Sequence, residues 1–179
     1  MFHILKILPD KEALLIDYIK ENQEKFYRLA FQYMKNQQDT FDVIQDAIVH
    51  SLEKVSSLKN PEYIRTWFYR ILVNKCLDHL RVVKRITYTD QIPESCNLPD
   101  PSCDRDAVLD LYDAIDKLEP KLKTIVILRF YEDMKLEEIS NVTGAHLSTV
   151  KARLYKALRL LRVDMQSDAL HSIQGSNSF

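Results

Sequence analysis

Residues 136–155 read LEEISNVTGAHLSTVKARLY, the pattern of two helices joined by a tight turn. Gly144 is the only glycine before the C-terminal tail, and it lies where the first helix must end. Glycine readily adopts the left-handed conformation that closes a helix. Ser140 is small and lies on the inner face of the first helix, and Ser148 is a suitable N-cap for the second. The segment therefore predicts a helix-turn-helix.

The second of these helices is expected from about Thr149 to Arg162, with apolar and basic residues on opposite faces. The apolar positions, expected to face the core, are Val150, Leu154, Ala157, Leu158 and Leu161. The charged positions are all basic: Lys151, Arg153, Lys156, Arg159 and Arg162. A basic helix face is often only solvated. Together with a glycine turn and a cap, however, it indicates a helix that lies in a DNA groove.

Composition limits the class of protein. A chain of 179 residues with 46% hydrophobic residues and two glycines fits one or two mostly helical domains. The net charge of −1 provides no overall field toward DNA, so DNA contact must come from local basic faces. Cys76, Cys96 and Cys103 have no metal-like spacing and indicate a reducing, cytoplasmic location, with Cys96 and Cys103 as free thiols or a redox pair. No run approaches the roughly 20 apolar residues of a membrane span.

Upstream of the helix-turn-helix, apolar spacing predicts three helices: residues 12–35, a second with Thr40 or Asp39 as its N-cap, and residues 61–83. The second is expected to bury Phe41, Ile44, Ala47, Ile48 and Leu52. The third carries a polar stripe through Thr66, Arg70, Asn74, Asp78 and Arg81, flanked by Lys75 and His79. From the residues alone, this stripe is either the solvated edge of a core helix or a nucleic-acid face.

The segment from 84 to 105 lacks helical periodicity and contains three prolines and several acids. A connection this long marks a boundary between domains. Helices resume at 106–117 and 121–132. The predicted organisation is all-α, with a helical domain at 10–83, an acidic linker at 84–105, a helix-turn-helix domain at 106–165 and a frayed tail at 166–179.

Three motifs in order resemble one family. DVIQD occupies 42–46 and WFYRILVNKCLDHLR occupies 67–81. The third motif extends from Leu118-Glu119-Pro120 through Arg129, then LEEI at 136–139 and STVKARLYKA at 148–157. They resemble regions 2.2, 2.3–2.4 and 4 of group 4, extracytoplasmic-function sigma factors of bacterial RNA polymerase. This resemblance implies two helical domains, region 2 and region 4, and a protein that recognises promoters and promotes strand opening but is not an enzyme.

The resemblance also implies roles for particular residues. Asp42, Gln45 and Asp46 would dock on core RNA polymerase. The −10 element, including its melted strand, would be bound by Arg70, Asn74, Lys75 and Arg81. The −35 element, as double-stranded DNA, would be bound by Arg129, Glu137, Thr149, Lys151, Arg153, Tyr155, Lys156 and Arg159. The acidic linker would enter the polymerase channel, unless it is an inert tether.

The family also implies an anti-sigma partner, often anchored in the membrane, and a cell-envelope stress response. No metal, cofactor or small-molecule substrate is expected, since no metal-like or phosphate-binding motif occurs in the sequence. Two other functions fit the helix-turn-helix: a one-component regulator that binds an operator as a dimer, and a helical protein whose basic helix contacts acidic protein surfaces. Purification with core polymerase separates the sigma factor from both.

Overall fold

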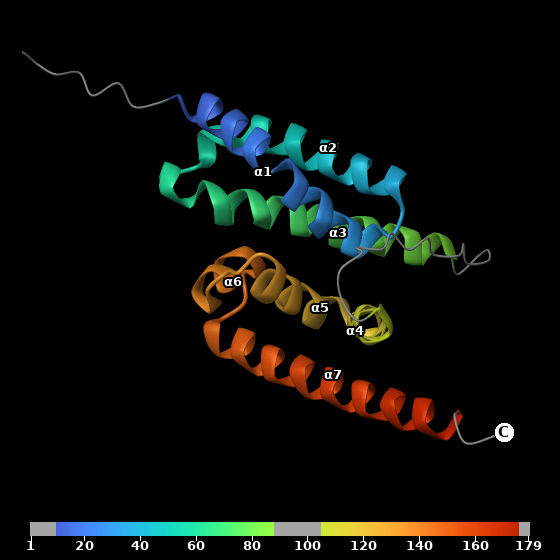
Figure 1. Cartoon of the computed structure of the whole chain (residues 1–179). Coiled ribbons are helices and arrows are strands. Elements are labelled where there is room, and N and C mark those ends of the chain that lie inside the picture. Colours follow the sequence, from blue (N-terminus) through green and yellow to red (C-terminus); the bar gives the residue numbers. More distant parts are fainter. Residues whose placement is uncertain (1–9, 88–104, 176–179) are drawn as a thin grey trace, which may run out of the picture. The chain divides into compact units, whose positions relative to one another are not determined.

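The computed structural model describes the chain over residues 10–87 and 105–175, and these segments are helices joined by short turns (Figure 1). No strand occurs within these two ranges, so the all-α prediction is confirmed. The chain divides into two compact units, residues 1–92 and residues 93–179. Cys96, Cys103 and most of the acidic linker lie outside the described residues.

Unit 1 is a bundle of three helices, α1 (Lys11–Met34), α2 (Gln37–Lys54) and α3 (Ile64–Thr87), each of which contacts the other two. Short 3₁₀ turns at Val55–Ser57 and Pro61–Tyr63 connect α2 to α3. Aromatic rings join α1 to α3 in the core. The ring of Phe26 lies 4.6 Å from that of Phe68 and 5.5 Å from that of Tyr69, the latter edge-on. Tilted and edge-on pairs of this kind stabilise a core beyond the area they bury.

The turn between α1 and α2 is closed by backbone and side-chain caps. Lys35 ends α1 in the left-handed conformation (φ 59°), and its N–H donates to the carbonyl of Phe31. Asn36 is the N-cap of α2, with its side chain accepting from the Asp39 N–H at 2.8 Å. The expected cap at Asp39 or Thr40 was therefore wrong, because the helix already begins at Gln37 and the Thr40 hydroxyl donates to the Asn36 carbonyl at 2.6 Å.

The buried face of α2 also differs from the prediction. The structure buries Thr40, Val43, Ala47 and Ser51, and it leaves Phe41 45% exposed. Thr40 and Ser51 can be buried on this face because the hydroxyl group of each donates a hydrogen bond to a nearby backbone carbonyl. Thr40 donates to the Asn36 carbonyl, and Ser51 donates to that of Ile48. The larger side chains of α2 are displaced toward the surface.

Unit 2 contains α4 (Arg105–Lys117), α5 (Pro120–Val126), α6 (Leu136–Thr143) and α7 (Leu147–Gly175). Its core joins α4, α5 and α7 through Ala114, Ile115, Leu118, Leu122, Val126, Ala157 and Leu161. The predicted single helix at 121–132 is instead α5 followed by a π-helical turn, Ile127–Tyr131. The Glu132 N–H bonds to the Ile127 carbonyl five residues back, which widens the turn before α6.

The helix-turn-helix is confirmed, with one change at its second helix. Gly144 ends α6 with φ 66°, and the Ser140 hydroxyl donates to the Ala145 carbonyl at 2.7 Å across the turn. Ser148 is not the N-cap, because α7 begins at Leu147 and the Val150 N–H bonds to the His146 carbonyl at 3.0 Å. The cap position therefore belongs to His146.

Two helices extend beyond their predicted ends. α3 reaches Thr87, inside the segment expected as linker, and α7 reaches Gly175, inside the segment expected as a frayed tail. Neither extension contains proline, and the only glycine is the final residue of α7. A helix that has already formed adds one hydrogen bond per residue, so it continues until a breaker intervenes.

Candidate functional site

The three residues expected to dock on a partner lie together on α2. Asp42, Gln45 and Asp46 are all exposed, and their spacing of three and four residues places them on one face of the helix. Gln38 Nε2 donates to Asp42 Oδ1 at 3.3 Å. Asp46 is 71% exposed, and its Oδ2 lies 3.6 Å from Lys75 Nζ on α3. The face is therefore acidic and accessible.

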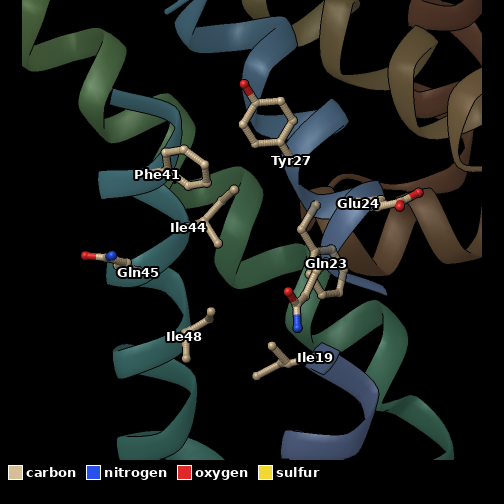
Figure 2. A pocket seen from close by; sticks show the side chains of 9 residues that line it. Ile19, Gln23, Glu24, Tyr27, Phe41, Ile44, Gln45 and Ile48 are labelled. Atoms are coloured by element: carbon tan, nitrogen blue, oxygen red, sulfur yellow. The ribbon is translucent and has the colours of Figure 1, made fainter. Parts of the chain in front are cut away.

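An apolar groove borders this acidic face (Figure 2). It has a volume of about 530 Å³ and lies between α1 and α2. From α2, Phe41, Ile44 and Ile48 face Ile19 and Tyr27 of α1, while Gln45 lies at the edge. The periodicity of α2 indicated these apolar residues but assigned them to the core, and an exposed Phe41 is the feature that the sequence did not reveal.

The polar stripe of α3 divides into two parts. Arg70 and Asn74 are exposed and share one face, one turn apart. Arg81 is also exposed, and its Nη1 lies 2.6 Å from Asp78 Oδ1. Lys75 is only 33% exposed and faces α2 rather than the stripe. The structure thus brings Arg70 and Asn74 together and separates Lys75 from them.

An exposed aromatic residue lies just before this stripe. Tyr63 ends the 3₁₀ turn before α3 and is 59% exposed. The turn is capped by Asn60, whose side chain accepts from the Glu62 N–H at 3.1 Å. The place of Tyr63 at the first turn, outside the bundle core, exposes it.

The basic face of α7 is accessible over its first three turns. Lys151, Lys156 and Arg159 are exposed, and Tyr155 is 71% exposed. Thr149 and Arg153 are half-buried. The opposite face buries Val150, Leu154, Ala157 and Leu161, as predicted. Leu158 is 39% exposed, so its assignment to the core was wrong, because the buried stripe of α7 is narrower than the apolar one.

Arg129 and Glu137 precede α7 and differ in their surroundings. Arg129 Nη1 donates to the Met134 carbonyl at 2.9 Å and lies 3.9 Å from Asp133 Oδ1. It therefore holds the turn between the π-helical segment and α6. Glu137 is exposed in the first turn of α6. Of the two, Glu137 is the one free to reach a ligand without breaking a backbone contact.

Comparisons with known proteins agree with this arrangement. The family model described as Sigma-70 region 2 matches residues 18–86, and that described as Sigma-70, region 4 matches residues 109–161. The chain is 44% identical to the RNA polymerase sigma factor SigV of Bacillus subtilis over 160 residues, covering 89% of this chain and 95% of SigV. The chain belongs to the RNA polymerase sigma factors. It is of the extracytoplasmic-function type and functions as an alternative sigma factor rather than a one-component regulator.

Two further comparisons concern the sequence of this sigma factor and its fold. The ECF sigma factor SigW of Bacillus subtilis is 26% identical over 88% of this chain and 91% of its own. The sigma factor RpoE of Bartonella quintana, solved in complex with the anti-sigma factor NepR, has a TM-score of 0.68 at 18% identity. That likeness covers 85% of this chain and 98% of RpoE and shows a shared fold.

The family models place every candidate residue of the sigma factor in a matched region. The acidic face of α2 and the stripe of α3 fall within region 2, and the basic face of α7 falls within region 4. The final residues of α7, from 162 onward, lie beyond the region 4 match.

Three ionisable groups of the sigma factor with fully or partly buried side chains, Cys76, Tyr131 and Lys123, are not among these candidate residues. Burial raises the pKa of the Cys76 thiol to about 12. Burial, with a hydrogen bond to Tyr112, raises the pKa of Tyr131. Lys123 Nζ lies 2.8 Å from Asp116 Oδ1 and joins α5 to α4. Within the described ranges no group of histidine, cysteine or carboxylate side chains could hold a metal ion, and no helix is long and apolar enough to cross a membrane.

Proposed function

We propose that this sigma factor docks on core RNA polymerase through α2. The support is the combination of exposed acids at Asp42 and Asp46 with the apolar groove beside them. Carboxylates that meet basic residues of a partner fix orientation, and an adjoining apolar surface adds buried area. By family resemblance, the partner surface is the clamp helices of the large polymerase subunit.

Promoter recognition is assigned to α3 and α7. On α3, Arg70 and Arg81 would bind phosphates of the −10 element, and Asn74 would pair with a base edge of the melted strand. On α7, Lys151, Tyr155 and Lys156 would reach bases of the −35 element, where the first turns of a recognition helix enter the major groove. Thr149, Arg153 and Arg159 would contact phosphates, which position the helix without reading sequence.

Contacts within the protein bear on the roles proposed for Arg129 and Lys75 but not on that of Glu137. Arg129 orients the turn before α6, so its contribution to −35 binding would be indirect. Glu137 remains a direct candidate. Lys75 can reach a phosphate only after leaving Asp46.

The remaining features of this proposal come from the family. The protein would act in the cytoplasm without a cofactor and catalyse no reaction, since polymerase performs the nucleotide chemistry. An anti-sigma factor, possibly membrane-anchored, would hold it inactive until a cell-envelope signal arrives. The similar RpoE structure, which contains an anti-sigma factor, supports this partner. The acidic linker would occupy the polymerase channel until nascent RNA displaces it.

Run-off transcription with bacterial core polymerase over a promoter library tests the proposal. We expect transcripts that depend on both the added protein and a shared pair of promoter elements. Binding to promoter DNA without initiation, across several core enzymes, would contradict it. The other function considered above, a helical protein that binds acidic protein surfaces, predicts neither transcripts nor DNA binding.

A further inference from the structure

Two acid–base pairs bridge α2 and α3, which lie side by side in unit 1 (Figure 1). Lys75 Nζ on α3 lies 3.6 Å from Asp46 Oδ2 on α2. One turn further along α3, His79 Nε2 lies 3.8 Å from Asp39 Oδ1. The order of the two pairs follows from the antiparallel helices, since moving forward on α3 means moving backward on α2.

The first pair connects the two surfaces to which separate roles are assigned above. Asp46 belongs to the polymerase-docking face and is 71% exposed. Lys75 belongs to the residues expected at −10 phosphates and is 33% exposed. A polymerase cation and a DNA phosphate would therefore each compete with one half of the same ion pair.

We propose that the Asp46–Lys75 ion pair couples polymerase docking to −10 DNA binding. This inference rests on the proposed function. A basic group of polymerase that takes over Asp46 releases the Lys75 ammonium for a phosphate. A phosphate that takes over Lys75 releases the Asp46 carboxylate for polymerase. Because linkage is reciprocal, each partner raises the affinity for the other by the same factor through this pair.

The size of the coupling is bounded by the strength of the pair. Ion pairs this exposed are weak, so the expected factor is about two- to fivefold. The packing of α2 against α3 does not depend on this ion pair, because Val43 and Ala47 of α2 and Leu72 of α3 are buried. Neutral variants at either position should therefore remain folded.

The test measures DNA binding by the free protein. Fluorescence anisotropy would report its affinity for a single-stranded oligonucleotide carrying the non-template −10 sequence obtained from the run-off library. We expect Asp46→Asn to bind this oligonucleotide about two- to fivefold more tightly than wild type at low salt, because Lys75 is released. The matched control is Glu53→Gln, which removes an α2 carboxylate whose Oε2 lies 3.9 Å from Nδ1 of His50 on its own helix. The difference between the two variants should shrink at high salt, where exposed charges are screened.

The Lys75→Gln background isolates the pair, because there Asp46→Asn should have no more effect than Glu53→Gln. In the reciprocal measurement, Lys75→Gln should bind core polymerase about two- to fivefold more tightly than wild type, and Lys75→Arg should not.

An Asp46→Asn effect that persists in the Lys75→Gln background, or equals that of Glu53→Gln in wild type, would overturn the coupling. If wild type with core polymerase fails to bind the oligonucleotide, the proposed function itself fails. If it binds but the double-mutant cycle is additive, only the coupling fails.

Discussion

Gly144 determines whether the turn between α6 and α7 can form. Its φ of 66° lies in the left-handed region, which costs a residue with a Cβ about 1–2 kcal/mol. We expect Gly144→Ala to lower the free energy of unfolding of unit 2 by about that amount. Urea unfolding followed by circular dichroism would measure it, with Gly144→Asn as a milder comparison because asparagine tolerates this conformation.

A second probe assigns the effect to one unit. Trp67 is the single tryptophan and lies in α3 of unit 1. Its fluorescence transition should be the same in wild type and Gly144→Ala. A shift of the Trp67 transition equal to that seen by circular dichroism would contradict a defect confined to unit 2.

Cys76 makes stability depend on pH in the alkaline range. Its pKa rises from 9.0 to about 12 on burial, so between these values only the unfolded chain releases the thiol proton. Stability from this group is therefore complete below pH 9.0 and declines as pH rises. Relative to Cys76→Ala, wild type should lose about 1.4 kcal/mol between pH 8 and pH 10. Urea titrations of both proteins at the two pH values would show this, and an unchanged difference would mean that the thiol is accessible.

At the scale of the element, α7 combines a buried stripe with an exposed basic face. Lys151→Ala and Lys156→Ala should each reduce initiation at promoters with a −35 element, by about 1–3 kcal/mol if a base contact is lost. Transcription from matched templates with and without the −35 sequence would test this. The control is Lys117→Ala, an exposed lysine of α4. Equal losses on both templates would assign the two lysines to folding or polymerase contact.

The exposed part of the α3 stripe leads to a different expectation. Asn74→Ala should impair strand opening more than initial promoter binding, because Arg70 can still hold a phosphate and closed complexes should persist. Permanganate reactivity of unpaired thymines would report opening, and gel shift would report binding. Circular dichroism of the variant should match wild type, since Asn74 is exposed. Normal opening would mean that the stripe is only a solvated edge.

At the scale of the whole molecule, we expect assembly with polymerase to depend on α2. Gln45→Arg adds a positive charge at the edge of the groove and should weaken core binding about tenfold, the effect of roughly 1.4 kcal/mol. Co-purification and competition with wild type would measure it. Glu21→Gln, an exposed change on α1 outside the groove, should leave core binding unchanged. Unchanged binding of Gln45→Arg would remove α2 from the docking surface.

Local sequence was sufficient to predict several parts of this sigma factor. The turn at Gly144, the small inner residue Ser140 and the basic face of α7 were all predictable, because each depends on backbone preference or helical period within a few residues. The two-domain, all-α organisation was predictable for the same reason, since periodicity and proline content report it directly.

Other features depended on the packed tertiary structure. The helical period of α2 predicted a buried face that was off by about one residue position. Packing against α1 and α3 instead buried the face that carries Thr40 and Ser51. The same packing exposed Phe41 beside a groove, turned Lys75 toward Asp46 and left Asn74 exposed. Likewise, the π-helical turn brought Arg129 to the Met134 carbonyl. A residue's own chemistry sets what it can bind, but only its neighbours from distant segments decide whether it is buried, paired or accessible.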